Sequence, residues 1–437
     1  MDARIRRLYL IATVLAFLIT APLLVAYSRG WRYDMDQHRI IQTGSFTVTS
    51  IPSGVDVRLN GSLINTTPIR SQRFTPGTYV LSLSKDGWIS REQAITIQAG
   101  QATVVEDVVL IKDDPEPVRM LDGNVVMLES SPDYSRRITV VQTNEGFDLF
   151  FNENPLGDFR LIRSVQNSPR DIRWSSDKTS ALITFEKENG QYSEYLVVSA
   201  SRVEFIPEIS GEKLRNVFWD TSRDSMLWLW VDHTLREFGT DTEYAIPEEL
   251  TPILITQDIA YAIRTEDDRP TLIAYTLLSG DERVIDSVKA SPIMSASLVG
   301  PYFAFTDPES HATSFMKKVG GQHVMISDKE RATRVSWSSD TEQLLLLDGY
   351  SITTLDEKHT NTLVRYSTGI QSASWLPNTS IILFLNEGDV YSLDLSQTPS
   401  IVSKLYDSDA HLFANDINGD YLFIADTTGI LRLRLRS

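Results

Sequence analysis

The first pattern along the chain is a run of twenty uncharged, mostly apolar residues over positions 8–27. In a helix that rises 1.5 Å per residue, this run spans about 30 Å, the thickness of the hydrocarbon core of a bilayer. Three arginines lie within the seven residues before it, whereas the two arginines that follow are offset by Asp34 and Asp36. The positive-inside rule therefore predicts a cytoplasmic tail over 1–7, a transmembrane helix over 8–28 and an extracytoplasmic remainder.

Two other interpretations of this run stay open. Ala26-Tyr27-Ser28 loosely matches a signal-peptide cleavage site, but the run is longer than the usual apolar region of about 7–15 residues, which favours an uncleaved signal-anchor. A buried helix of a soluble protein is less favoured, because the rest of the chain reads as β-structure. Tyr27, Trp31 and Tyr33 occupy the positions of an interfacial aromatic belt.

After a predicted juxtamembrane linker over 29–43, the apolar period changes to two, which is typical of half-buried strands. Turn signals such as Asn60-Gly61, a strong two-residue hairpin signal, separate the alternating runs. We therefore predict a compact β-sandwich of about six short strands over 44–112. The alternating apolar residues are Phe46, Val48, Val55, Val57, Leu59, Tyr79, Leu81, Leu83, Ile95 and Ile97.

The turns of this stretch resemble those of the PEGA domain. The name-giving tetrapeptide appears as Pro52-Ser53-Gly54-Val55, with the Glu and Ala replaced, while the later Asn-Gly, Thr-Pro, Pro-Gly-x-Tyr and Gly-aromatic spacing is intact. The resemblance implies a surface-exposed β-module of envelope proteins without catalytic residues. Its glycines suit backbone positions with positive φ. The turn residues are Pro52, Gly54, Asn60, Gly61, Pro68, Pro76, Gly77, Tyr79 and Gly87.

A motif recurs with a period of about 40 residues in the remainder, 113–437. Trp-Ser-Ser-Asp occurs at Trp174–Asp177 and at Trp337–Asp340, with looser copies at Trp219 and Trp375. Each copy precedes an apolar strand, and a β-type repeat of this length is typical of propeller blades. We expect eight repeats starting near residues 124, 168, 213, 250, 292, 331, 369 and 409, with seven blades as the alternative. Strand 117–121 would complete the last blade and close the ring.

These repeats resemble the WD40-like, TolB-type propeller repeat, whose signature is Trp-Ser-Pro-Asp-Gly before an apolar strand. No copy here is complete. The expected fold class is thus all-β apart from one N-terminal transmembrane helix, with a small PEGA-like β-sandwich and a β-propeller. The residues with a fixed place in the repeat are Trp174, Asp177, Trp219, Trp337, Asp340 and Trp375.

The charge and the candidate chemistry narrow the function. Beyond residue 33 the chain has 36 basic and 57 acidic residues, which disfavours nucleic acid as a partner, and it has no cysteine. The six histidines are scattered and form no metal-binding motif. Asp416, Asn418 and Asp420 match the start of a calcium loop, but Tyr421 and Thr427 replace its Gly and Glu, so a polar β-turn is the better interpretation.

The four repeat tryptophans could stack on a sugar, but their place in the repeat favours packing between blades. We predict no catalytic, cofactor-binding or metal-binding residue, and no cofactor. The expected function is a non-enzymatic, membrane-anchored binding or scaffold protein of the cell envelope. Its predicted partners are the lipid bilayer, through residues 8–27, and an envelope protein or cell-wall polymer, with the oligomeric state left open. The alternative is a propeller enzyme acting on envelope glycans, which would need convergent carboxylates or a metal cluster at its funnel.

Overall fold

The computed structural model describes residues 3–34, 38–186, 193–207, 213–266, 269–289, 295–307, 310–319, 322–357, 359–397 and 399–436. The chain divides into two compact units. The N-terminal unit is Met1–Asp114 with the short segments Ser396–Pro399 and Arg436–Ser437. The C-terminal unit is Pro115–Leu395 and Ser400–Leu435. The sequence also predicts a polar hairpin turn at Asn189-Gly190, which lies outside the described residues.

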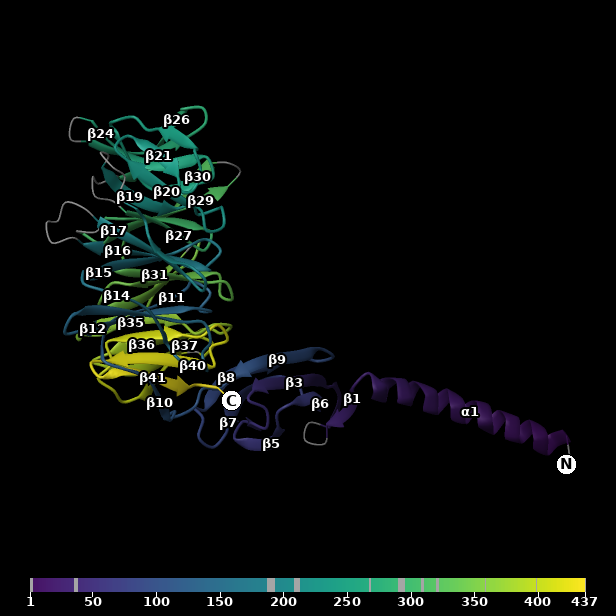
Figure 1. The fold of residues 1–437 in the computed structure, drawn as a ribbon. Coiled ribbons are helices and arrows are strands. Elements are labelled where there is room, and N and C mark those ends of the chain that lie inside the picture. Colours follow the sequence, from purple (N-terminus) through teal and green to yellow (C-terminus); the bar gives the residue numbers. More distant parts are fainter. Residues whose placement is uncertain are drawn as a thin grey trace. The chain divides into compact units, whose positions relative to one another are not determined.

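The N-terminal unit begins with a single long helix, α1 (Ala3–Ser28), which Figure 1 shows as the coiled ribbon nearest the N-terminus. Its segment Leu10–Ser28 has a mean hydropathy of 2.3, and none of it is buried by the rest of the protein. The predicted apolar N-terminal helix is therefore confirmed. Residues 29–43, expected as a linker, contain a small antiparallel sheet of their own, made of β1 (Trp31–Asp34) and β2 (Arg39–Gln42).

Two sheets form the β-sandwich that follows. In the first, β3 (Gly44–Ile51) lies between β6 (Ile69–Phe74), which is antiparallel to it, and β9 (Ala102–Val109), which is parallel. The second has the order β5 (Ser62–Thr66), β4 (Asp56–Leu59), β7 (Gly77–Ser84) and β8 (Arg91–Ile97).

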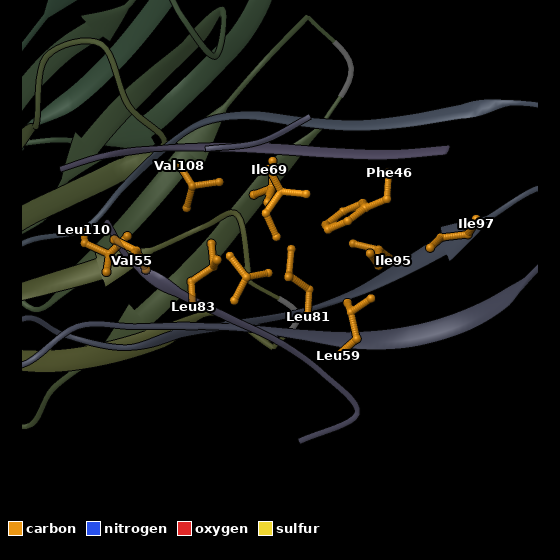
Figure 2. Close-up of a cluster of buried hydrophobic side chains, with 12 residues drawn as sticks. Phe46, Val55, Leu59, Ile69, Leu81, Leu83, Ile95, Ile97, Val108 and Leu110 are labelled. Carbon is orange, nitrogen blue, oxygen red and sulfur yellow. The ribbon is translucent and has the colours of Figure 1, made fainter. Parts of the chain in front are cut away.

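The core lies between these sheets because alternate side chains of each strand point to the same face. Figure 2 shows Phe46 and Ile69 from the first sheet facing Leu81 and Leu83 from the second. Of the predicted alternating residues only Tyr79 is not fully buried. Burying one aliphatic side chain of this size contributes about 1.5–3 kcal/mol, so the alternation accounts for much of the stability of the sandwich.

The PEGA-like turns have the geometry that the sequence predicts, with one exception. Asn60 and Gly61 both have positive φ, at 48° and 80°, and join β4 to β5 as a two-residue hairpin. Gly54 and Gly87 also have positive φ. Gly77 does not: it is the first residue of β7 and pairs with Ile97, so the prediction of positive φ was wrong there. Pro52 is buried, whereas Pro68 and Pro76 are exposed.

Tyr79 holds the loop before β7, because its hydroxyl lies 2.8 Å from the Thr75 carbonyl oxygen and 2.7 Å from the Thr75 Oγ1. We expect Tyr79→Phe to lower the free energy of unfolding of this unit by about 1 kcal/mol, since the ring stays and one hydroxyl is lost. Chemical denaturation of the purified protein measures this. Thr78→Val, a neighbouring exposed substitution, is the control, and an equal loss there would contradict the assignment.

The described residues of the C-terminal unit form eight four-stranded antiparallel sheets. Each is built from strands that follow one another along the chain, except the last. Sheets 1 to 4 consist of β11 (Asn124–Ser130), β12 (Arg137–Thr143), β13 (Gly146–Asn152) and β14 (Arg160–Val165); β15 (Pro169–Trp174), β16 (Ser180–Glu186), β17 (Ser193–Ser199) and β18 (Val203–Phe205); β19 (Leu214–Trp219), β20 (Leu227–Val231), β21 (Thr234–Glu237) and β22 (Glu243–Ala245); and β23 (Leu250–Thr256), β24 (Ile259–Glu266), β25 (Arg269–Thr276) and β26 (Glu282–Lys289).

Sheets 5 to 8 continue the series. They consist of β27 (Ser295–Val299), β28 (Tyr302–Thr306), β29 (Ala312–Val319) and β30 (Gln322–Arg331); β31 (Arg334–Ser338), β32 (Gln343–Leu347), β33 (Ser351–Leu355) and β34 (Thr360–Arg365); β35 (Ile370–Trp375), β36 (Ile381–Asn386), β37 (Asp389–Asp394) and β38 (Ile401–Tyr406); and β39 (Leu412–Asn415), β40 (Tyr421–Asp426), β41 (Gly429–Arg434) and β10 (Pro117–Asp122).

Sheet 8 joins the two ends of the unit. Its fourth strand, β10, opens the unit and pairs antiparallel with β41, which ends it, so that Pro117 lies opposite Leu433 and Asp122 opposite Gly429. Figure 1 shows β10 beside β41. The pairing gives β41 a partner on its second edge, and an unpaired edge is the usual liability of a sheet.

Each sheet buries both of its faces against its neighbours. Strand β36 is buried at all six positions and β20 at all five, so neither alternates between buried and exposed side chains. Continuous apolar strands of this kind are stable only where both faces of the sheet are covered. The chain is therefore mostly β with one N-terminal helix, as predicted, and the C-terminal unit has a propeller-like fold.

Candidate functional site

A cavity of about 810 Å³ lies at the centre of the C-terminal unit. Residues from the first strands of the described sheets 1 to 7 line it, together with residues of β39 from sheet 8. A cavity lined by one edge strand from each of eight sheets requires the sheets to stand around a common axis. Because ligands bind preferentially in concave sites with a few converging polar groups, this cavity is the candidate site.

An ion pair connects two sheets that are not adjacent. Arg334 on β31 donates a hydrogen bond of 2.8 Å to Glu129 on β11. Both side chains remain partly exposed because they face the cavity. Burial in the cavity wall raises the pKa of Glu129 above its ordinary value, and the charge of Asp171 adds to this, although Arg334 opposes both.

A second ion pair lies on the wall next to the first. Arg173 Nε is 3.1 Å from a carboxylate oxygen of Asp171, and both residues belong to β15. Glu129 and Asp171 are the acidic residues among the described residues that line the cavity. Each contacts an arginine, so the wall presents paired charges rather than free carboxylates.

The repeat tryptophans pack between sheets, and three of them also line the cavity. Trp174 lies in the cluster shared by sheets 1 and 2, Trp219 in that of sheets 2 and 3, Trp337 in that of sheets 5 and 6, and Trp375 in that of sheets 6 and 7. Trp174 and Trp337 are only half-buried, and both line the cavity together with Trp219. Stacking on a ligand in the cavity and packing between sheets are therefore compatible roles for these side chains.

The two repeat aspartates differ in their surroundings. Asp177 accepts hydrogen bonds from Ser175 and Thr179 in its own turn and from Ser225 in the next sheet. Burial alone would raise the pKa of Asp177, but these hydrogen bonds outweigh it and hold the pKa below its ordinary value. Asp340 is exposed. In one copy, the aspartate of the turn motif thus links two sheets. In the other copy, its carboxylate is exposed to solvent.

Asp220, which follows Trp219, is the most enclosed of the turn aspartates. It is fully buried and accepts hydrogen bonds from the Ser222 and Arg223 backbone, from Arg223 Nε at 2.8 Å, and from the Gln257 backbone in the next sheet. Burial would raise the pKa of Asp220, yet these donors lower it below the ordinary value. The Asp220 carboxylate thus links the turns of sheets 3 and 4 through these hydrogen bonds.

A pH dependence of stability follows from Asp220. Because its pKa is lower in the folded protein than in the unfolded chain, the carboxylate stabilises the fold above the ordinary pKa of about 3.9 and loses that effect as the pH falls toward the folded pKa. We expect Asp220→Asn to lower the free energy of unfolding at pH 7 by about 2 kcal/mol and to make the acid-induced loss shallower. Denaturation curves between neutral and acidic pH measure this, and an unchanged acid slope would contradict it.

The other sequence candidates do not converge on the cavity. Asp416 accepts hydrogen bonds from the Asn418 and Tyr421 backbone, which is the geometry of a β-turn. Burial raises the pKa of Asp416 above its ordinary value. His323 lies against Tyr261, and His411 bonds to the Val125 carbonyl oxygen. No group of three or more metal-ligating side chains occurs among the residues that the structure describes.

Sequence reasoning missed the polar residues of the cavity wall. Asp171, Arg334 and Ser372 each stand three positions before a repeat tryptophan, and all three line the cavity. Arg334 Nη1 lies 3.5 Å from Ser372 Oγ. A comparison of equivalent positions across the repeats, rather than of neighbours in the chain, is the signal that would have found them.

Comparison with solved structures gives distant similarities. A structure described as a eukaryotic initiation factor is 10% identical with a TM-score of 0.44, and the match covers 72% of this chain and 89% of that one. A prolyl endopeptidase is 12% identical with a TM-score of 0.44, covering 70% of this chain and 54% of that one. KlHsv2 is 13% identical with a TM-score of 0.39, covering 67% and 99%. At such low TM-scores these similarities do not bear on the function of this protein.

A comparison with curated proteins found no match to this chain. One protein-family model does match, over a range that coincides with the β-sandwich and starts one residue before β3. The sandwich, with its Asn60-Gly61 hairpin and the Tyr79 loop, is the part of the chain that the match covers. Residues 43–109 match the family model of the PEGA domain.

Proposed function

We propose that this protein is a membrane-anchored, extracytoplasmic binding protein of the cell envelope, with α1 as its anchor and the propeller-like unit as its binding module. The observation that carries the proposal is the apolar surface of α1, since Leu10–Ser28 buries none of its side chains inside the protein. In water, exposed apolar surface costs about 25 cal/mol per Å², and burial of the helix in a bilayer removes this cost. The PEGA match at 43–109 agrees with an extracytoplasmic location.

The cavity wall favours binding over catalysis. An enzyme that cleaves glycans typically uses two carboxylates on opposite sides of the bond, one as an acid and one as a base or nucleophile. Here Glu129 is hydrogen-bonded to Arg334 and Asp171 is paired with Arg173. Paired charges beside half-buried tryptophans suit recognition of a polar partner at the cavity mouth. Release of soluble sugars from purified envelope glycans by the protein would overturn this assignment.

Orientation is tested with introduced cysteines, because the chain has none of its own. Leu278→Cys places a thiol at a residue of the C-terminal unit that is 68% exposed, and Asp2→Cys places one in the N-terminal tail. We expect a membrane-impermeant maleimide to label Cys at position 278 in intact cells and Cys at position 2 only after the membrane is permeabilised. The reverse pattern would reject the proposed orientation.

Crosslinking from the mouth of the cavity tests whether a partner binds there. Leu298 lines the cavity and is 42% exposed, whereas Val118 on the outer strand β10 is 47% exposed and does not line it. We expect a photoreactive amino acid at position 298 to crosslink one envelope component in intact cells, and the same residue at position 118 to give no such adduct. Identical adducts from both positions, or none from either, would argue against the cavity as the binding site.

A further inference from the structure

Two arginine side chains hold the C-terminal end of α1, one from the β-sandwich and one from β1. Arg73 on β6 donates hydrogen bonds of 3.1 Å to the Tyr27 carbonyl oxygen and 2.9 Å to the Ser28 carbonyl oxygen. Arg32 donates a third, of 2.9 Å, to the Tyr27 carbonyl oxygen, and its guanidinium stacks on the Tyr27 ring at 3.6 Å. The last carbonyls of a helix lack partners within it, and cations stabilise that end. The helix therefore ends on the sandwich.

The residues after the helix are fixed in the same way. The Gly30 carbonyl oxygen accepts hydrogen bonds of 2.8 Å from both the backbone N–H and the Oγ1 of Thr43, and Gln42 Nε2 donates to the Arg29 carbonyl oxygen. Gly30 has a φ of 90°, and a Cβ there would lie 3.0 Å from Thr43 Oγ1. The β1–β2 hairpin thus starts and finishes at one point beside the helix end.

One face of this hairpin carries three exposed apolar or aromatic side chains beside Gln42. Trp31 and Tyr33 alternate on β1, and Ile40 stands opposite Tyr33 on β2, so the three side chains share one face of the ribbon. They are 42%, 57% and 67% exposed. An isolated two-stranded hairpin is marginally stable in water. An apolar face on such a ribbon therefore points to an environment that the protein itself does not supply.

The position of the hairpin along the chain identifies that environment. Leu10–Ser28 spans about 28 Å as a helix, close to the thickness of the hydrocarbon core, so the chain leaves the core near Ser28. Trp31 follows three residues later, and Trp and Tyr are enriched at the membrane–water interface. Arg29, between the helix end and β1, is exposed and complements the phosphates of lipid headgroups.

We propose that the β1–β2 hairpin is a second membrane contact, whose Trp31, Tyr33 and Ile40 face lies in the headgroup layer of the lipid bilayer. Because Arg73 and Thr43 hold the helix end against the sandwich, this contact also fixes how the PEGA domain faces the membrane. The inference rests on the anchoring role of α1 proposed above. It adds a lipid-binding surface outside the helix.

The test places an environment-sensitive NBD label at position 40 through Ile40→Cys, in the full-length protein reconstituted into phosphatidylethanolamine and phosphatidylglycerol vesicles. We expect blue-shifted NBD emission that is quenched by lipids carrying a nitroxide near the headgroup. Leu63→Cys, 55% exposed on β5 of the same sandwich, is the matched control and should report water. A water-like signal at position 40 in protein that stays in the vesicles after an alkaline wash overturns the inference and leaves the anchor intact.

The remaining outcomes are also decisive. Protein that the alkaline wash removes from the vesicles rejects the anchor itself, and a lipid-like signal at both positions rejects a contact confined to the hairpin. Arg73→Ala tests the contact without changing the hairpin residues that carry the label. This substitution should weaken quenching of the label at position 40 without releasing the protein. Arg70→Ala, an exposed arginine on the same strand, should change neither readout.

Discussion

Gly429→Ala should lower the stability of the propeller-like unit by about 2–4 kcal/mol, because the added methyl group would strike the strand that closes sheet 8. Gly429 opens β41 with a φ of 152°, and a Cβ there would lie 2.0 Å from the Leu121 carbonyl oxygen. That atom belongs to the backbone of β10, so no side-chain rotation can relieve the contact. The substitution must displace β10 from β41, which leaves both edges unpaired.

The measurement is chemical denaturation followed by tryptophan fluorescence. Six of the eight tryptophans belong to the C-terminal unit, so the signal reports mainly on it. Gly369→Ala is the matched control, since this glycine has no positive φ and its nearest neighbour would lie 3.6 Å from a Cβ. A Gly429→Ala transition at the wild-type midpoint would show that the pairing of β10 with β41 does not stabilise the unit.

Arg137→Ala should lower the free energy of unfolding by a similar amount, about 3 kcal/mol, because it removes the donors that several buried acceptors bond to at the junction of sheets 1 and 8. Arg137 on β12 is fully buried and donates two hydrogen bonds, of 3.0 and 2.7 Å, to Asn152 Oδ1. It also donates to the Asn415 carbonyl oxygen at 3.3 Å and stacks 4.4 Å from the centre of the Phe423 ring. These partners lie in the first and the last sheet.

Charge does not complicate this prediction near neutral pH. Burial lowers the pKa of Arg137 to about 10, with the nearby carboxylate of Asp416 opposing, so the guanidinium stays protonated at pH 7. We expect Arg137→Met to recover part of the loss by filling the volume, while the acceptors remain unpaired. Arg170→Ala removes an exposed arginine on β15 and should stay within about 0.5 kcal/mol of wild type. An equal effect of both alanine substitutions would refute the role given to burial.

Much of the fold could be predicted because its signals are local. The repeat starts inferred from the Trp-turn pattern, near 124, 168, 213, 250, 292, 331, 369 and 409, fall within three residues of the first residues of β11, β15, β19, β23, β27, β31, β35 and β39. Period-two alternation likewise predicted the sandwich core, and Asn60-Gly61 predicted its hairpin. Such patterns reflect side-chain direction and backbone φ, which neighbouring residues decide.

The candidate site could not be predicted in the same way. Glu129 and Arg334 are 205 residues apart, and neither belongs to a motif that marks a charged pair. Only the arrangement of the sheets around a common axis brings β11 and β31 to one cavity. The hairpin of residues 31–42 was missed for a related reason, since its strands are four residues long and Arg73, which anchors the adjacent helix end, comes from a distant strand.

The sequence by itself determined the apolar helix, the alternating strands and the forty-residue repeat, because each depends on the order of side chains within a few turns or strands. The tertiary structure alone decided which charges are buried. Arg136 and Arg137 look alike in the chain, yet Arg136 stays partly exposed while Arg137 is enclosed by Asn415 and Phe423. The physical reason is that burial of an arginine depends on partners that closure of the ring brings from the far end of the chain.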